Sequence, residues 1–183
     1  MKDFIFVTGS QNKVIEAERL LRVKLQSQAI DLPEIQSVDL EEIITKKAMF
    51  AYEVLGGQSV IVEDTGLFIE AWNGLPGALV KWFIERVGVA GICKMMHEFP
   101  DKKAWAKTVV ATHDGEIKLF AGQVNGRIAE TPVGNAGFGW DKIFVPTGAD
   151  KTFAEMSASE KDAYSMRRKA FESMRTYYSH LFD

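Results

Sequence analysis

The chain has 183 residues, 46% of them hydrophobic, so it is long enough to bury a core, and this composition excludes a disordered chain. Its net charge of -3 and pI near 5.7 provide no overall attraction to nucleic acid or to an anionic membrane surface. The single cysteine, Cys93, excludes an internal disulfide, and no stretch approaches the roughly 20 apolar residues of a membrane span. From the charge we expect no nucleic-acid or membrane partner. Because the N-terminus lacks the apolar run of a signal peptide, we expect a cytoplasmic protein.

The predicted strands and helices alternate along the chain, and a predicted hairpin precedes the last helix. Short β-branched or aromatic runs indicate the strands, and apolar residues at helical spacing indicate the helices. Because the hairpin around Asp114-Gly115 adds an antiparallel pair, the predicted class is α/β with a mixed sheet. In chain order the predicted elements are a strand over 4–7, a helix over 12–23, a strand over 26–30, a helix over 40–55, a strand over 60–62, helices over 78–87 and 89–99, hairpin strands over 105–112 and 117–124, and a helix over 163–182.

The turn between the first strand and the first helix is the first chemical motif. A helix N-terminus presents unpaired N–H groups and a partial positive charge, which suits a phosphate. It is not a Walker A loop, because the four-residue spacer and the second glycine are absent. The alternative is an ordinary capped helix with its lysine in solvent. The residues of this predicted phosphate site are Thr8, Gly9, Ser10, Gln11, Asn12 and Lys13.

Two adjacent carboxylates, Glu63 and Asp64, end the predicted strand over 60–62 and precede a predicted turn. Buried charges need a partner, and magnesium takes one or two carboxylates together with phosphate oxygens and water. If the strand continued through the pair, the two side chains would point to opposite faces, and at most one could bind the metal directly. We expect Asp64 to be the metal ligand because it is nearer the predicted turn. Glu34, beside Pro33, offers a further carboxylate. The alternative is a surface Glu34 and a Glu63 that pairs with a lysine.

A glycine-rich aromatic segment over 134–141 is the third motif. Glycines on both sides of an aromatic ring allow close approach of a flat ligand, and stacking of a nucleobase contributes roughly 1–3 kcal/mol. A nucleobase is therefore the natural candidate. The alternative is a bulge with Phe138 and Trp140 in the core. Basic residues scattered along the sequence complete the set: Lys13, Lys46, Lys81, Lys161, Arg167 and Arg168, the last two on the predicted polar face of the final helix.

Seven short blocks, in order from about residue 4 to 175, resemble the inosine triphosphate pyrophosphatase (Ham1-like) family. Seven blocks in one order are more specific than any single block. They are Phe6-Val7-Thr8-Gly9-Ser10-x-Asn12-Lys13, Asp31-Leu32-Pro33-Glu34, Val62-Glu63-Asp64-Thr65-Gly66-Leu67, Gly74-Leu75-Pro76-Gly77, Lys81-Trp82-Phe83, Phe138-Gly139-Trp140-Asp141, and Ala154-Glu155-Met156 with Glu160-Lys161.

The resemblance implies a magnesium-dependent hydrolase that cleanses the nucleotide pool. It would convert non-standard purine nucleoside triphosphates such as ITP, dITP and XTP to the monophosphate and pyrophosphate. The implied fold is a long, mixed, twisted sheet flanked by helices, with two lobes and a central cleft, in one domain over residues 1–183. A homodimer is also implied. Trp72, Trp82 and residues 84–96 are candidates for its interface, or equally for the core.

The resemblance also implies roles for individual residues. Residues 8–13 would hold the triphosphate, with Lys13 and Glu63 in the catalytic group. Glu34 and Asp64 would bind magnesium, and Asp64 would accept a proton from water. The other implied substrate-binding residues are Lys46 and Lys81 near the phosphates, Thr65 beside the acidic pair, Phe138, Gly139, Trp140 and Asp141 at the base and sugar, Lys161 at the base, and Met166 and Arg167 at the positions of the family's Ser-His-Arg motif.

One position departs from the family pattern. Where the family reads Ser-His-Arg, this chain has Ser165-Met166-Arg167. The missing histidine donates toward the purine 6-keto oxygen, and a thioether is only a weak acceptor. Either base discrimination is relaxed or rebuilt through Lys161, Arg167 or Arg168, or Met166 only extends the apolar stripe of the last helix. Two alternative functions follow: the same chemistry on another modified or pyrimidine nucleotide, as in Maf-like pyrophosphatases, or nucleotide binding without turnover.

Overall fold

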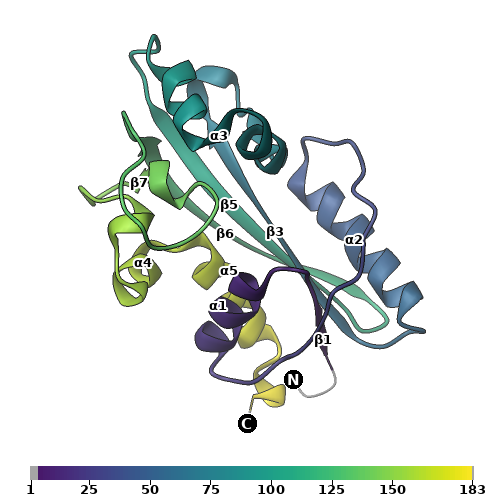
Figure 1. The fold of residues 1–183 in the computed structure, drawn as a ribbon. Helices are drawn as coiled ribbons and strands as arrows, with labels where there is room; N and C mark the ends of the chain where they lie inside the picture. Colours follow the sequence, from purple (N-terminus) through teal and green to yellow (C-terminus); the bar gives the residue numbers. More distant parts are fainter. Residues whose placement is uncertain (1–3, 183) are drawn as a thin grey trace. The chain divides into compact units, whose positions relative to one another are not determined.

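A 7-stranded mixed sheet is the central element of the fold (Figure 1). The computed structural model describes residues 4–182, so both ends of the domain predicted over 1–183 lie outside the described residues. The strand order is β2-β1-β3-β5-β6-β7, with β4 paired to β3. Strand β1 is parallel to β2 and β3, whereas the β3–β4 and β6–β7 pairs are antiparallel, which confirms the mixed sheet. The strands are β1 (Ile5–Val7), β2 (Gln26–Gln28), β3 (Val60–Ile69), β4 (Pro76–Gly77), β5 (Lys103–His113), β6 (Ile117–Ile128) and β7 (Phe144–Pro146).

Most of the predicted helices are present. Gly88 interrupts α3 with a φ of 68°, a conformation that glycine adopts without steric cost, so two predicted helices form the two halves of one kinked element. The helices are α1 (Gln11–Leu21), α2 (Leu40–Val54), α3 (Val80–Met96), α4 (Ala158–Tyr164) and α5 (Met166–Tyr177), with short 3-10 turns η1 (Glu70–Trp72), η2 (Asp141–Ile143), η3 (Phe153–Glu155) and η4 (Ser179–Leu181).

The chain divides into two compact units, each assembled from separate segments. Strands β3, β5 and β6 supply residues to both units. The chain passes from one unit to the other between Asp64 and Thr65 and between Met166 and Arg167, inside two of the predicted motifs. Unit 1 comprises Met1–Asp64, Thr108–Gly122 and Arg167–Asp183, and unit 2 comprises Thr65–Lys107 and Gln123–Met166.

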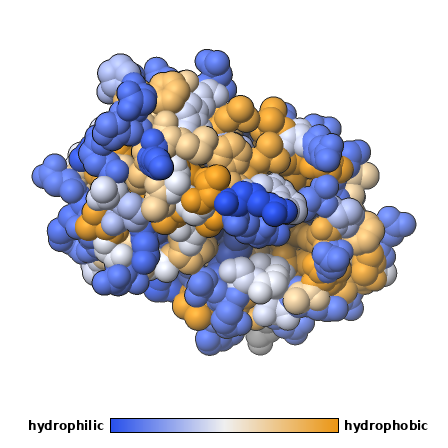
Figure 2. Space-filling model, turned by 45° about the horizontal axis from the view of Figure 1, so that its top comes forward, coloured by the Kyte–Doolittle hydropathy of each residue, from blue (hydrophilic) through white to orange (hydrophobic). Residues whose placement is uncertain are grey.

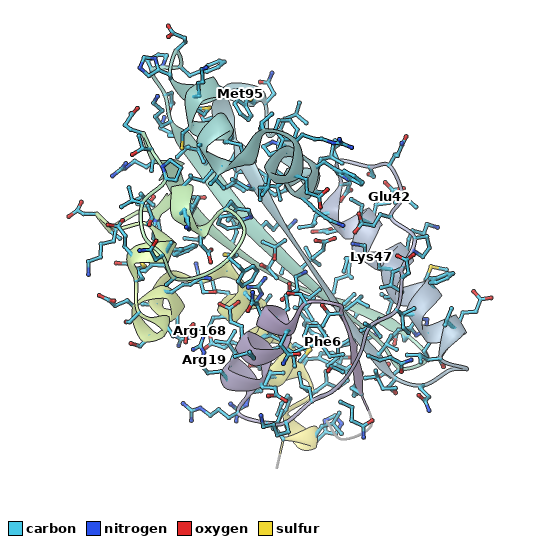
Figure 3. All side chains as sticks on the ribbon, in the orientation of Figure 1. Phe6, Arg19, Glu42, Lys47, Met95 and Arg168 are labelled. Atoms are coloured by element: carbon cyan, nitrogen blue, oxygen red, sulfur yellow. The ribbon has the colours of Figure 1, made fainter. Side chains whose placement is uncertain are left out.

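The core of unit 1 joins β1 to helices α1 and α5, which lie side by side (Figure 1). Phe6 of β1, labelled in Figure 3, meets Phe171 of α5 edge to face, with ring centroids 6.2 Å apart. Ala17 of α1 and Ala170 of α5 are fully buried, so the two helices approach without large side chains at these points. Burial of each large apolar side chain contributes about 1.5–3 kcal/mol. This packing holds the N-terminus of α1 beside the sheet.

The core of unit 2 contains apolar residues of β3, α3, β5 and β6 together with an aromatic cluster. The ring of Trp140 lies 5.5 Å from that of Phe144, and Phe144 lies 5.3 Å from Phe153. Trp140 is buried in this cluster, so the alternative that placed it in the core is confirmed for this residue. Its burial anchors the end of the segment over 134–141 in the core of unit 2.

Strand β3 differs from the prediction, because it does not turn after Val62. It continues through the acidic pair to Ile69, and its later residues pair with β4, Phe68 opposite Pro76. The ladder with β4 supplies backbone hydrogen bonds that cannot be read from the Thr65-Gly66 sequence. A turn predicted at this point was therefore wrong.

The prediction of the last helix, over 163–182, was also wrong about where the helix starts and about which residues form its polar face. A separate helix, α4, runs over Ala158–Tyr164: Ser157 caps its start in a capping box, and Ser165 follows its end with a ψ of 123°, which is not helical. Helix α5 then runs over Met166–Tyr177. Arg167, expected on the polar face, is buried, because it finds carboxylate partners inside unit 1.

The visible face in Figure 2 carries hydrophobic residues in separate patches among hydrophilic ones. Of the two tryptophans considered for a dimer interface, Trp72 packs against the core of unit 2 and Trp82 is 48% exposed. The homodimer stays a prediction. Within residues 4–182, no helix combines the length and the apolarity needed to cross a bilayer.

Candidate active site

The N-terminus of α1 is an ordered turn in unit 1. Ser10 is the N-cap, and its hydroxyl accepts a hydrogen bond from the Lys13 N–H at 3.4 Å. The Thr8 hydroxyl accepts from the Ser10 N–H at 3.1 Å. A Cβ added at Gly9 would meet no described atom within 4 Å, and Gln11 and Asn12 are exposed. The turn that was predicted to bind phosphate therefore has hydrogen-bonded Thr8 and Ser10 hydroxyls, and there is free space beside Gly9.

Lys13 is not a solvated surface lysine. Its ammonium lies 3.1 Å from Glu63 Oε1 and donates to the backbone carbonyl of Glu63, also at 3.1 Å. The alternative of a simple capped helix with its lysine in solvent is thereby wrong. This contact joins the predicted phosphate turn to the acidic pair on β3.

Glu63 is completely buried and is held by two cations. Besides Lys13, the guanidinium of Arg167 contacts both of its oxygens, Nε to Oε2 at 2.5 Å and Nη2 to Oε1 at 3.1 Å. Burial alone would raise the pKa of the Glu63 carboxyl, but the charges of Arg167 and Lys13 outweigh it and lower that pKa to about 2. Glu63 is therefore an anion that orients neighbouring groups.

Asp64 points to the other face of β3, as alternation along a strand requires. Its Oδ2 lies 2.7 Å from the ammonium of Lys47, which also lies 2.9 Å from Glu34 Oε1. Lys47 extends from α2 (Figure 3), and Glu34 belongs to the irregular segment between β2 and α2. The structure thus brings Glu34 and Asp64 to one cation, the ammonium of Lys47. The magnesium that the resemblance implied for these two carboxylates stays a prediction.

Lys47 was missed by the sequence analysis, which named Lys46. Lys46 is exposed, whereas the Lys47 side chain is only 11% exposed. Burial would lower the pKa of Lys47, but the charge of Asp64 and hydrogen bonds to both carboxylates raise it. The helical spacing could have revealed it: positions 44, 47, 48 and 51 form one buried stripe, so a lysine at 47 requires an anionic partner.

The donor set around Lys47 fits a magnesium ion. Two carboxylate oxygens from Glu34 and Asp64 already converge on a positive charge, and magnesium prefers oxygen ligands. The side chains of Glu34 and Asp64 are 44% and 21% exposed, so water and phosphate oxygens can reach them. Among the residues described by the structure, no three His, Cys, Asp or Glu side chains gather in a metal-holding group. The remaining ligands would therefore be water and substrate.

In unit 2, the segment over 134–141 is held by one buried carboxylate. Asp141 Oδ2 accepts from the Phe138 N–H and from the Lys161 ammonium, both at 2.9 Å. Gly137 has a φ of 72°, and a Cβ there would lie 2.2 Å from Asp141 Oδ2. The Phe138 ring is only partly buried, and its centroid is 5.4 Å from the Lys161 ammonium. This arrangement presents an aromatic ring and a cation together.

The other predicted residues of unit 2 have different environments. Met166 is buried in the core of the unit, which supports its interpretation as part of an apolar stripe. Lys81 is exposed beside Trp82, with its ammonium 5.7 Å from the ring centroid. Thr65 is half-buried on β3, and Gly139 is exposed next to Phe138.

A mixed α/β fold with a lysine–carboxylate cluster at a helix N-terminus is an arrangement suited to proteins that bind phosphorylated ligands. Residues 4–177 match the model of the Ham1 family, and the chain belongs to this family.

Named relatives are similar over nearly the whole chain. The dITP/XTP pyrophosphatase of Methanopyrus kandleri is 42% identical over 95% of this chain and 95% of its own. The inosine triphosphate pyrophosphatase of Kluyveromyces lactis is 39% identical over 96% of this chain and 95% of its own. A Ham1 protein from Coxiella burnetii has a TM-score of 0.83 at 26% identity, covering 98% of this chain and 100% of that one. These structural and sequence likenesses confirm the predicted family and fold class.

Proposed function

We propose that this protein hydrolyses non-standard purine nucleoside triphosphates, such as ITP, dITP and XTP, to the monophosphate and pyrophosphate. One observation carries the proposal: Glu34 and Asp64 meet at a single positive charge, while Glu63, next to Asp64, binds the lysine of the α1 turn. The relatives named as ITP or dITP/XTP pyrophosphatases support the substrate class.

The triphosphate would be bound by residues 8–13. The N–H groups at the start of α1 and the Lys13 ammonium provide donors and positive charge for its oxygens. Glu34 and Asp64 would hold magnesium, which supplies charge neutralisation at the phosphate oxygens and makes water more acidic. Positioning and electrostatic stabilisation of this kind account for most of the acceleration in phosphoryl transfer.

The reaction would begin with attack of a water oxygen on the α-phosphorus. The α–β anhydride bond breaks, pyrophosphate leaves, and the water proton passes to the carboxylate of Asp64. Asp64 suits this role because it is partly open to solvent and held by Lys47, whereas Glu63 is enclosed by Arg167 and Lys13.

The base would stack on Phe138, whose backbone is held by Asp141. Of the three residues considered as substitutes for the missing histidine, Arg167 contacts Glu16 and Glu63, and Arg168 contacts Glu172. Lys161 is the one whose ammonium lies over the Phe138 ring, so we assign it the purine 6-keto oxygen.

Pyrophosphate release with ITP, dITP, XTP, dUTP and ATP, each with magnesium, tests the proposal. We expect turnover of the first three and much slower turnover of ATP. Fastest turnover of dUTP would favour the alternative pyrimidine specificity. Calorimetric binding of ITP without pyrophosphate release would instead favour a binding protein, and either result would contradict the proposed function.

A further inference from the structure

We infer that Arg167 is a positioning residue for the triphosphate: it holds Glu63, and Glu63 in turn holds the Lys13 ammonium at the start of α1. This inference rests on the proposed function, and it replaces the direct substrate contact that the resemblance implied for Arg167. The residues that carry it all belong to unit 1.

The guanidinium of Arg167 connects the two elements that carry the proposed phosphate-binding and catalytic groups. Its Nε and Nη2 contact Glu63 on β3, and its Nη1 contacts Glu16 Oε2 on α1. The side chain is 3% exposed, so these charge-assisted contacts lie out of water, where loss of one partner is costly. Glu16 is one helical turn beyond Lys13, on the same face of α1. Arg167 therefore fixes α1 against β3 close to Lys13, which contacts the same Glu63 carboxylate.

The four charged groups named above also match in number. Glu16 and Glu63 contribute two negative charges, and Arg167 and Lys13 contribute two positive charges. If Arg167 were neutral, the cluster would carry a net negative charge at the turn where a polyanion is proposed to bind. The buried Glu63 carboxylate would then draw the Lys13 ammonium away from the turn. Both effects weaken binding of any polyphosphate, whatever base it carries.

A base-contacting arginine would behave differently. Its loss would change the ratio of turnover among ITP, XTP and ATP and would leave a base-free polyphosphate unaffected. Loss of an arginine that acts through Glu63 and Lys13 would weaken all of these ligands by a similar factor. Inorganic tripolyphosphate, which has no base, therefore distinguishes the two roles.

The experiment measures tripolyphosphate binding in the presence of magnesium by calorimetry, for the parent, Arg167→Met and Arg167→Lys. We expect Arg167→Met to weaken binding by about tenfold or more, and Arg167→Lys to weaken it less because the charge is kept. Arg175→Met, two turns further along α5, is the control and should bind as the parent does. In a Lys13→Met background, Arg167→Met should have a clearly smaller further effect, because the part of the loss that acts through Lys13 is already absent.

Kinetics provide the second readout. Arg167→Met should raise KM for ITP and XTP by similar factors and leave their kcat/KM ratio within about twofold of the parent. Unchanged tripolyphosphate affinity, a large change in that ratio, or full additivity with Lys13→Met would each overturn the inference. If Arg167→Met does not fold, Glu16→Gln decides, with an expected weakening of about threefold in the same direction.

The two proposals can fail separately. A parent protein that binds tripolyphosphate in an Arg167-dependent manner but cleaves no triphosphate would contradict the proposed function and support the inference. A parent that does not bind tripolyphosphate at all would overturn the inference.

Discussion

The ammonium of Lys47 lies 2.7 Å from Asp64 Oδ2, where a partly exposed carboxylate of β3 meets a buried lysine of α2. The same ammonium contacts Glu34, so it is shared by the two carboxylates to which we assign magnesium. A divalent cation bound there must compete with this lysine for the same oxygens.

Substitution of Lys47 by methionine should therefore strengthen divalent cation binding. We expect the dissociation constant for Mg²⁺ or Mn²⁺, measured by calorimetry without nucleotide, to fall by about three- to tenfold, because a competing charge is removed. Lys46→Met changes an exposed neighbour and should leave metal affinity near the parent value. Weaker metal binding in Lys47→Met would mean that the lysine supports the metal site instead of competing for it.

Asp64→Asn should fold and lose most turnover. The amide is nearly isosteric and the side chain is partly exposed, so the circular dichroism spectrum and melting temperature should stay close to those of the parent. Without a proton acceptor, kcat for ITP should fall by about 100-fold or more, measured as pyrophosphate release. Asp150→Asn, at an exposed position in a loop, is the control. Activity near the parent level in Asp64→Asn would remove Asp64 from its assigned role.

The Glu63 cluster predicts a stability loss in acid. The fold lowers the pKa of Glu63 from 4.5 to about 2, so its contribution is complete above pH 4.5 and is lost as pH falls toward 2. That contribution is on the order of 3 kcal/mol. Urea unfolding between pH 6 and pH 2.5 should show a shallower decline for Glu63→Gln than for the parent. Parallel declines for the two proteins would show that Glu63 does not contribute to the pH dependence.

Gly137→Ala tests the close approach of Gly137 to the Asp141 carboxylate, which also accepts a hydrogen bond from the Phe138 N–H. An alanine at this positive φ would be strained, and its Cβ would meet the Asp141 carboxylate. Gly56→Ala is a matched control, since φ is also positive at +64° but no described atom lies within 4 Å of the added Cβ. We expect Gly137→Ala to be less stable than Gly56→Ala by about 1–2 kcal/mol in denaturant unfolding. A raised KM for ITP should accompany it, and equal stability of the two variants would contradict the described contact.

Met166→His tests whether the family histidine could act at this position. Because Met166 is buried among apolar residues of unit 2, an imidazole there should lower the free energy of unfolding by about 2 kcal/mol. We expect no gain in the ratio of ITP to ATP turnover. Met166→Leu keeps the volume and should cost less than about 1.5 kcal/mol. A clear increase in discrimination by Met166→His would show that the side chain reaches the base.

The predictable parts of this protein were those set by neighbours in the sequence. The strand–turn–helix over residues 4–23 follows from a short apolar run, a capping serine and helical spacing, and the structure has these elements within two residues of the prediction. The hairpin and the kink at Gly88 were likewise recognisable from local glycine and apolar patterns. The family blocks further identified Glu34 and Asp64 as a pair.

The partners of buried charges were decided by tertiary structure alone. Arg167 and Glu63 are 104 positions apart, and no local rule indicates that this arginine, rather than its neighbour Arg168, turns inward. The same holds for the continuation of β3 through the acidic pair, which depends on pairing with another strand. Local sequence determines helices, turns and apolar faces because their energies arise between near neighbours. Burial of a charge is decided by residues that meet only after folding, since desolvation is offset only where an opposite charge already lies.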